Sequence, residues 1–536
     1  MSARHDEVVV VGAGPTGLVA AALLRCHGIR CRVIDREPGP TGHTRAIGVS
    51  ARSLEVLDEI GVADELVSRG LPSRVANFYA EGRPLARLTS ARTRNTRFPY
   101  LLAVPQAETE RVLSKRLREL DVEVERGVEL EGLELHEEEV ELREAAHRAP
   151  RRGLAAWVVA ADGSHSTVRK ALGIEFEGVA TGRTFANVDA ILDPPPVAGE
   201  GHYYFSPEGL LVIAPLPDGV FRVTALVSDE EADRELTAAD VQRLIDSRAG
   251  GATRVSRLED AGWGVVTVAV QARIATRFSA GRCFLAGDAA HVFGPTGAQG
   301  MNTGIQDAHN LAWKLALVAR GVAAPGLLES YEAERAAAAR KVLHAVEMQT
   351  KMATVQGRGG RVLRNGLLRA LAATGVVDRR LAPRISQLDV DYGDLRWARA
   401  FDRAAPAGKR LPDATVGAAG ETIFPLLRRR PFNLVVLGDE GEARSLCERL
   451  SAPLDVHVVG RTAGGSGLHD VDGALAGFMG HRGTRIALVR PDGHVAAAGS
   501  GRDLDAIVEH LVEEMLNDCG GGLRASRATE PPVARR

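Results

Sequence analysis

From residue 7 to residue 17 the chain reads EVVVVGAGPTG, and an Ala- and Leu-rich run follows to His27. A short β-branched run, a tight glycine turn and a helix-forming run in this order predict a strand, a loop and a helix. A second strand is expected over residues 30–34 and ends at Asp35, about 20 residues beyond the glycines. This order is typical of dinucleotide-binding βαβ units, so the first domain is predicted to be of the Rossmann type.

The three glycines of this loop meet different physical needs. Gly12 permits a tight turn, Gly14 lets the backbone approach a pyrophosphate, and Gly17 lets the helix pack closely on the strand. The amino terminus of the helix presents unpaired N–H groups and the positive end of its dipole to the phosphates. Asp35 stands where an acid accepts hydrogen bonds from the adenosine ribose. These features suit NAD as well as FAD.

A second segment decides between the two cofactors. It reads GDAAH at residues 287–291 and continues through Pro295 to GMN at residues 300–302. Asp288 follows a buried run, where an acid can accept a hydrogen bond from a ribityl hydroxyl, and the glycines let backbone amides approach the isoalloxazine edge. The helix predicted from Met301 to Arg320 points its dipole at the flavin pyrimidine ring, where negative charge collects on reduction. The two segments together predict one FAD site.

His291 lies close in sequence to Asp288, which raises the alternative of a His–Asp dyad for nucleophilic catalysis. Such a dyad serves a serine, which α/β-hydrolases hold on a strained turn between a strand and a helix, and the sequence shows no serine of that kind here. We therefore interpret His291 as a structural or flavin-adjacent residue.

Length and composition limit the class of protein. A chain of 536 residues exceeds a single core of roughly 250–300 residues, so two or three domains are expected. Hydrophobic residues make up 45% and charged residues 25%, as in ordinary globular proteins, and a formal net charge of −2 offers no field for nucleic acid. The chain shows neither a membrane-spanning apolar run nor a signal peptide. Its five cysteines form no CxxC pair and no metal-ligand spacing, so we expect a cytoplasmic protein without a metal site.

The remaining chain divides into three parts. Short β-rich runs punctuated by Pro-Asp-Gly and Pro-Pro-Pro predict a mostly antiparallel sheet over residues 181–275, inserted between 1–180 and 276–394 of a discontinuous FAD-binding domain. Residues 395–519 are predicted to form a thioredoxin-like α/β domain without its dithiol, and residues 520–536 a disordered tail. The strands of the thioredoxin-like domain are expected at 432–437, 455–459 and 485–489, and its helices at 440–450 and 504–516. The predicted fold class is therefore α/β, with a Rossmann-type FAD-binding domain, an inserted, mostly antiparallel β-sheet domain for the substrate, and a carboxy-terminal thioredoxin-like domain.

Three motifs occur in an order that identifies a family resemblance. GAGPTG stands at residues 12–17, ADGSHSTVR at 161–169 and FLAGDAAHVFGPTGAQGMN at 284–302. Over about residues 6–395 the chain resembles the single-component FAD-dependent aromatic hydroxylases, the class of para-hydroxybenzoate, phenol and polyketide hydroxylases. The carboxy-terminal unit resembles the appendage of the polyketide and chlorophenol hydroxylase branch.

The resemblance implies further site residues. Asp162 and Gly163 match a segment that touches both FAD and the nicotinamide cofactor, Arg169 closes this segment, and Gln106 matches a glutamine that contacts FAD. Arg45 and Arg52 are the candidate catalytic residues, and the register of HTRAIGVSAR at 43–52 does not decide between them. The cofactor-binding residues predicted in all are Gly12, Gly14, Pro15, Thr16, Gly17, Asp35, Arg36, Arg45, Gln106, Asp162, Gly163, Arg169, Asp288, Pro295, Gly300, Met301 and Asn302.

The function implied is that of an FAD-dependent monooxygenase. NADPH, or alternatively NADH, would reduce the flavin, and oxygen would pass from a flavin C4a-hydroperoxide to a phenol or a polycyclic polyketide of antibiotic biosynthesis. Tyr203, Tyr204, Phe205 and Ile213 are expected in the substrate wall. Baeyer–Villiger or drug-inactivating oxygenation and a non-catalytic metabolite-binding protein are the alternatives. We expect a monomer or homodimer with no nucleic-acid or membrane partner.

Overall fold

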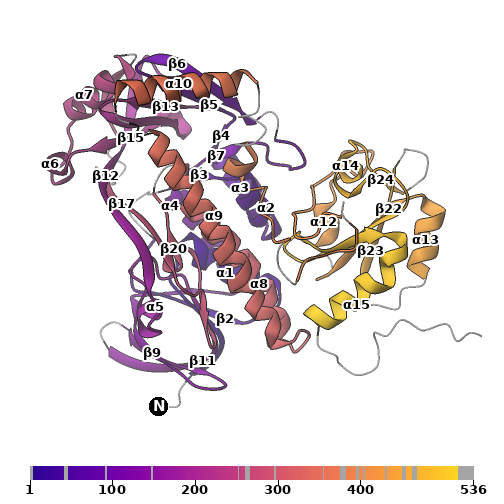
Figure 1. Cartoon of the computed structure of the whole chain (residues 1–536). Helices are drawn as coiled ribbons and strands as arrows, with labels where there is room; N and C mark the ends of the chain where they lie inside the picture. Colours follow the sequence, from indigo (N-terminus) through magenta and orange to yellow (C-terminus); the bar gives the residue numbers. More distant parts are fainter. Residues whose placement is uncertain are drawn as a thin grey trace, which may run out of the picture. The chain divides into compact units, whose positions relative to one another are not determined.

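The computed structural model divides the chain into two compact units (Figure 1). The first comprises Met1–Ala312 with Tyr331–Asp389, and the second comprises Trp313–Ser330 with Val390–Arg536. The residues described are 4–40, 46–90, 93–146, 149–251, 253–259, 266–294, 297–353, 355, 357–374, 382–393, 397–402, 405–428, 431–448, 454–461 and 467–516. The predicted tail from residue 520 lies outside them.

An eight-stranded sheet with a parallel centre forms the base of the first unit. Its order is β18 (Ser279–Ala280), β19 (Cys283–Leu285), β11 (Ala149–Ala160), β1 (Arg4–Val11), β2 (Cys31–Asp35) and β8 (Val124–Arg126), with β10 (Val140–Ala146) beside β11 and β9 (Val128–Leu135) beside β10. β1 runs parallel to both β2 and β11, and Val8, Val9 and Val10 are fully buried. Such a run suits a strand covered on both faces. The predicted Rossmann-type unit is confirmed.

Helices surround this sheet and the short sheet of β3 (Gly48–Val49), β7 (Leu101–Ala103) and β4 (Leu71–Ser73). They are α1 (Pro15–Cys26), α2 (Ala51–Glu59), α3 (Ala63–Arg69), α4 (Gln106–Glu119), α5 (Thr167–Ala171), α8 (Gln299–Ala319) and α9 (Glu329–Ala353). α8 begins two residues before the predicted start at Met301, and its residues from Trp313 belong to the second unit. Among the described helices none is long and apolar enough to cross a membrane.

The second sheet of this unit has nine strands. Their order is β20 (His291–Val292), β17 (Val266–Ala275), β12 (Phe176–Asp193), β15 (Val220–Val227), β14 (Gly209–Pro215), β13 (Glu200–Ser206), β5 (Val75–Ala80) and β6 (Arg83–Thr89), with β16 (Arg254–Leu258) beside β12. All neighbours are antiparallel except β13 and β5, which run parallel. The sheet therefore draws two strands from before residue 181, where the sequence analysis expected only the first domain.

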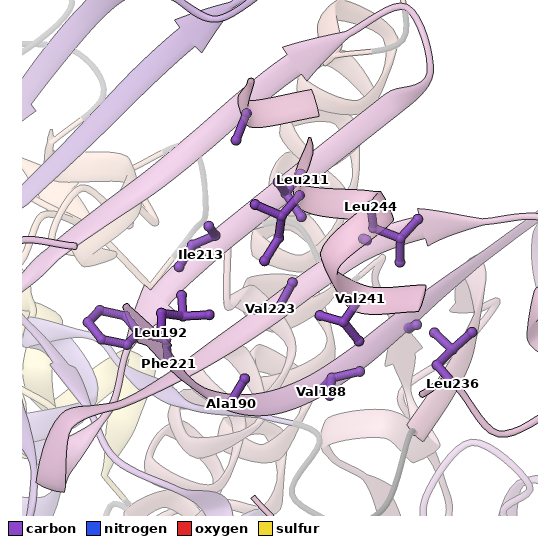
Figure 2. Close-up of a cluster of buried hydrophobic side chains, with 14 of the residues drawn as sticks. Val188, Ala190, Leu192, Leu211, Ile213, Phe221, Val223, Leu236, Val241 and Leu244 are labelled. Carbon is purple, nitrogen blue, oxygen red and sulfur yellow. The ribbon is translucent and has the colours of Figure 1, made fainter. Parts of the chain in front are cut away.

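One face of this sheet is covered by α7 (Ala238–Ala249), which follows the short α6 (Asp229–Ala232). Figure 2 shows Val241 and Leu244 of the helix together with Val188, Leu211 and Val223 of the strands in one buried cluster. Thr237 caps α7 through a capping box with Asp240, and Gly250 ends the helix in the left-handed conformation. α10 (Arg358–Ala373) lies beside β6 (Figure 1).

The second unit contains a six-stranded sheet. Its order is β21 (Arg399–Ala400), β26 (Val495–Ser500), β25 (Arg485–Val489), β22 (Asn433–Gly438), β23 (Asp455–Gly460) and β24 (Leu468–His469), with helices α12 (Phe424–Leu427), α13 (Glu440–Glu448), α14 (Ala474–Met479) and α15 (Leu504–Met515). β22, α13 and β23 form a parallel βαβ unit, and β25, β26 and α15 an antiparallel ββα unit. This is the thioredoxin-like arrangement that the sequence predicts.

Candidate functional site

The glycine loop after β1 has the geometry of a phosphate-binding turn. Gly12 has φ +100°, and a Cβ added there would overlap with the carbonyl oxygen of Ala161. A Cβ on Gly17 would overlap with the carbonyl oxygen of Gly12, so the helix and the loop are as close as two backbones allow. A Cβ on Gly14 meets nothing within 4 Å. Gly12 and Gly17 therefore make the tight turn possible, and Gly14 leaves space beside the start of the helix that follows.

The helix α1 starts at this open space. Gly14 is its N-cap, Pro15 occupies the first turn, and no side chain among the described residues caps this end. The first N–H groups of an uncapped helix have no partner within the helix, and the helix dipole places positive charge there. Thr16 and Gly17 lie in this first turn. The arrangement suits an anion such as a pyrophosphate.

Asp35 at the end of β2 supports the same loop. Its Oδ2 accepts a hydrogen bond from Ala13 N–H at 2.6 Å, and its Oδ1 accepts one from Glu37 N–H at 2.8 Å. Arg126 lies 3.7 Å from the same Oδ2. The neighbouring Arg36 is exposed and pairs with Glu37. Asp35 thus braces the glycine loop, a role that the sequence analysis did not predict, and its contact with a ribose stays a prediction.

The second motif lies directly against the first. Residues Gly287–Ala289 form a 3-10 turn after β19, and Gly287 has φ +61°. A Cβ on Gly287 would come within 2.6 Å of Thr16 Oγ1, and one on Gly304 would overlap with the same oxygen and lie 3.0 Å from Gly287 Cα. Asp288 is the exposed residue of this turn. The structure therefore brings together the two segments that the sequence analysis combined into one site.

Asp162 stands beside the glycine loop. Its Oδ2 accepts hydrogen bonds from Thr167 N–H at 2.7 Å and Val168 N–H at 3.2 Å, at the start of α5. Its Oδ1 is buried without a hydrogen-bond partner among the described residues. Burial raises the pKa of this carboxyl group. Gly163 has φ +79° and open space around its Cα. A buried acceptor without a partner is costly, which points to a group supplied from outside the protein.

Arg169 connects this segment to the second motif. Its guanidinium donates to Ala289 O at 2.9 Å and to Ser164 O at 2.8 Å, and it lies 3.9 Å from the centre of the Phe176 ring. The side chain is buried, and burial lowers its pKa. Arg169 therefore fixes the two segments to each other. Its direct contact with a cofactor stays a prediction.

Two amide side chains hold the segment that follows residue 45. Asn302 in the first turn of α8, next to Gly300 and Met301, accepts from Ser50 N–H at 2.8 Å and donates to Gly48 O at 2.9 Å. Gln106 at the start of α4 accepts from Ala46 N–H at 3.3 Å. Both amides are thus engaged with the protein backbone, and their contact with FAD stays a prediction.

Of the two candidate catalytic arginines, Arg52 lies within the described residues. Arg52 lies in α2, is buried, and forms an ion pair with Glu55 at 2.9 Å. A guanidinium in such a pair is held in place by the protein itself. Arg45 and the cofactor-binding candidate Pro295 lie outside the described residues.

Sequence reasoning missed Asp307 on α8. His291 Nε2 lies 2.6 Å from its Oδ2, which also accepts Gly287 N–H at 3.0 Å, and Arg335 Nε donates to its Oδ1 at 2.7 Å. Burial opposes ionisation of Asp307, but His291 and Arg335 outweigh it and lower the pKa of the carboxyl. His291 is thus paired with Asp307 and embedded in the fold, as the structural interpretation expects. In the sequence Asp307 is one of several polar residues of the predicted helix, which gives no signal of this role.

The residues expected in the substrate wall lie on two faces of the nine-stranded sheet. Tyr204 and Ile213 belong to the buried cluster under α7, so they point away from the other face of the sheet. Side chains alternate along a strand, and Tyr203 and Phe205 therefore lie on the opposite face. There Phe78 stacks on both rings, with centroid distances of 4.9 Å to Tyr203 and 6.1 Å to Phe205.

Comparison with known proteins agrees with this geometry. A family model described as FAD binding domain matches residues 5–346, and one described as aromatic-ring hydroxylase, C-terminal, matches residues 404–518. The 6-methylpretetramide 4-monooxygenase of Streptomyces rimosus is 35% identical over 93% of this chain and 91% of that protein. The rifampicin monooxygenase of Streptomyces venezuelae is 34% identical over 92% and 95%. The solved structure of the anhydrotetracycline hydroxylase OxyS from Streptomyces rimosus aligns with TM-score 0.75 at 31% identity and covers 96% of this chain and 99% of that chain.

Proposed function

This chain belongs to the FAD-dependent aromatic-ring hydroxylases, and on that premise we propose that it adds one oxygen atom to a ring of a polycyclic aromatic polyketide with NADPH as electron donor. In the balanced reaction NADPH, a proton, dioxygen and the substrate give NADP⁺, water and the hydroxylated product. A cytoplasmic location and a monomeric or homodimeric state belong to the same proposal.

The observation that carries the flavin chemistry is the junction of the two motifs. Within the part of the chain that the structure describes, Gly14 faces open space, α1 starts without a side-chain cap, and Asp162 Oδ1 has no hydrogen-bond partner, and all three suit a bound dinucleotide. FAD, when bound, supplies the redox and oxygen chemistry. The part left to the protein is to hold the pyrophosphate at Gly14, to offer Asp288 to a hydroxyl, and to keep water from the reacting ring.

The substrate class is inferred from the aromatic face of the nine-stranded sheet. Phe78, Tyr203 and Phe205 form a stacked cluster on the face opposite α7, where the Arg364 guanidinium of α10 lies 5.2 Å from the centre of the Phe205 ring. β20, at one edge of this sheet, begins two residues after the Gly287–Ala289 turn, and the aromatic cluster lies on β13 and β5 toward the other edge of the same sheet. Flat aromatic side chains favour stacking with a fused-ring substrate. One relative is named for 6-methylpretetramide, and one solved structure is named for anhydrotetracycline.

The relative named as a rifampicin monooxygenase supports a second candidate, the oxygenation of a drug-like macrocycle. Both candidates use the same flavin site, and they differ only in what lies against the aromatic face. A Baeyer–Villiger insertion also adds one oxygen atom, so mass alone does not separate it from hydroxylation.

The test is a substrate screen with the purified holoenzyme. Anhydrotetracycline, other polyketide aglycones, simple phenols and rifampicin are each added with NADPH, and NADPH oxidation, peroxide release and product mass are measured. We expect an aglycone to stimulate oxidation and to gain one oxygen atom, with a fragmentation pattern that places the hydroxyl on an intact ring. Oxidation that yields only hydrogen peroxide for every compound, or a product only from rifampicin, would contradict the polyketide proposal.

A further inference from the structure

One carboxylate oxygen of Asp307 contacts both ends of the segment 287–291, which carries Asp288. We call this arrangement the clamp. Gly287 N–H and His291 Nε2 both reach Asp307 Oδ2, at 3.0 Å and 2.6 Å. Between these two residues lie only Asp288, Ala289 and Ala290. The chain from residue 287 to residue 291 is thus a loop closed by one buried acceptor, and Asp288 is its exposed residue.

The clamp is itself held from a third element. Arg335 on α9 is 1% exposed, donates to Asp307 Oδ1 at 2.7 Å and also donates to Thr303 O at 3.3 Å. A buried carboxylate is costly unless charges and donors compensate it, and Arg335 supplies the charge. The acceptor therefore stays ionised, and its position is determined by α8 and α9 together.

The turn has little freedom on its other side. Gly287 and Gly304 both face Thr16 Oγ1 with less room than a methyl group needs. A small displacement of the turn would either collide with α1 or separate Asp288 from the phosphate loop. The position of Asp288 relative to Gly14 therefore depends on what holds Gly287.

We propose that Asp307 is a positioning residue for FAD, which sets the Gly287–Ala289 turn against α1 through the Gly287 N–H and thereby presents Asp288 to the cofactor. The inference rests on the proposed flavin site and adds to it a residue that does not touch the cofactor. Arg335 serves as the counter-charge of the clamp, and His291 closes its far end.

The test separates positioning from simple stability. It uses two double variants, and both carry Arg335→Met so that no unpaired buried cation remains. Asp307→Asn/Arg335→Met keeps an oxygen that accepts from Gly287 N–H, whereas Asp307→Leu/Arg335→Met removes the acceptor. The dissociation constant of FAD is measured on the apoprotein by flavin fluorescence, together with the visible spectrum of the bound flavin and the melting temperature. We expect the Asn variant to bind FAD nearly as wild type and the Leu variant to bind it at least about tenfold more weakly with an altered spectrum.

A matched control removes another buried link between α8 and α9. Asn310 Nδ2 donates to Glu334 Oε2 at 2.7 Å, and both residues are buried. The variant Asn310→Leu/Glu334→Met should lower the melting temperature and leave FAD affinity within about threefold of wild type. Equal affinity of the Asn and Leu variants, or an equal loss of affinity in the control, would overturn the proposal. The readout of this test is FAD binding and not hydroxylation. A wild-type protein that binds FAD and hydroxylates nothing would therefore refute the proposed function, and the same FAD titrations would still decide the role of Asp307.

Discussion

Thr16 and Gly287 lie against each other where the two halves of the flavin site meet. A Cβ on Gly287 would stand 2.6 Å from Thr16 Oγ1, and Gly304 on α8 faces the same hydroxyl. Three elements, α1, the turn after β19 and α8, therefore converge on a point with no room for a methyl group. Side-chain size at this point controls how well the two halves fit.

The variant Gly304→Ala should weaken FAD retention, because its methyl group pushes Thr16 and Gly287 apart. Overpacking of this kind costs about 1–3 kcal/mol. Thr16→Ala removes the hydroxyl that the new methyl group meets, so the double variant should recover part of the loss. Flavin content after purification and melting temperature measure both effects.

The control for this pair is Gly366→Ala in α10, where an added Cβ meets nothing within 4 Å. It should keep full flavin content, since alanine is favoured in a helix by about 1 kcal/mol over glycine. Additive effects of Thr16→Ala and Gly304→Ala, without any recovery, would show that the two positions do not share this contact.

Substitutions at two glycines of the loop, Gly14 and Gly17, should have different effects, one on FAD binding and one on folding. Gly14→Val should yield a folded protein without FAD, because no atom of the described residues lies within 4 Å of the added Cβ and this space suits the pyrophosphate. Gly17→Ala should instead destabilise the fold, because its methyl group overlaps with Gly12 O. Circular dichroism and flavin absorbance distinguish the two. A yellow Gly14→Val protein with full occupancy would remove the phosphate-loop assignment.

Asp288→Ala should weaken FAD binding while leaving the fold intact. The side chain is exposed on a turn whose ends are held by Asp307, so its removal leaves the clamp in place. A charged acceptor lost from a hydroxyl group costs roughly 1.5–3 kcal/mol. Titration of the apoprotein with FAD measures the change, and unchanged affinity would mean that Asp288 is directed elsewhere.

The sequence predicts those strands, turns and helices that are determined by the pattern of their own residues. The strand from Glu7, the glycine turn and α1 follow one another within 20 residues, and their periodicity and glycines suffice to place them. The strands at 432–437, 455–459 and 485–489 agree with β22, β23 and β25 to within one residue at each end. Each of these elements carries its own pattern of buried residues.

What depends on distant partners was not predictable in this way. β5 joins the nine-stranded sheet through parallel pairing with β13, more than 100 residues later, and nothing in Val75–Ala80 specifies that partner. Asp307 appears in sequence as one polar residue in an amphipathic helix, and only the fold brings His291 and Arg335 to it. Alternation separates Tyr204 from Phe205, but the sequence does not say which face α7 covers.

These neighbouring residues allow a test of the substrate face. Phe205 lies opposite α7, in the cluster with Phe78 and below the Arg364 guanidinium, which is 5.2 Å from its ring centre. Phe205→Ala should raise KM for a polyketide aglycone and increase peroxide release, because a poorly seated substrate admits water to the reacting site. The effect on melting temperature should be small, since this ring is only half-buried.

Tyr204 is the matched position on the other face. It is 8% exposed, stacks on Tyr79 at 4.7 Å, and burial raises the pKa of its hydroxyl to about 12. Tyr204→Ala should cost about 3 kcal/mol of stability through the cavity it leaves under α7, with KM of the folded fraction unchanged. Initial-rate assays at a temperature well below the melting temperature give KM and peroxide yield for both variants. If Tyr204→Ala raises KM while Phe205→Ala leaves it unchanged, the substrate lies on the α7 side and the assignment of the two faces must be reversed.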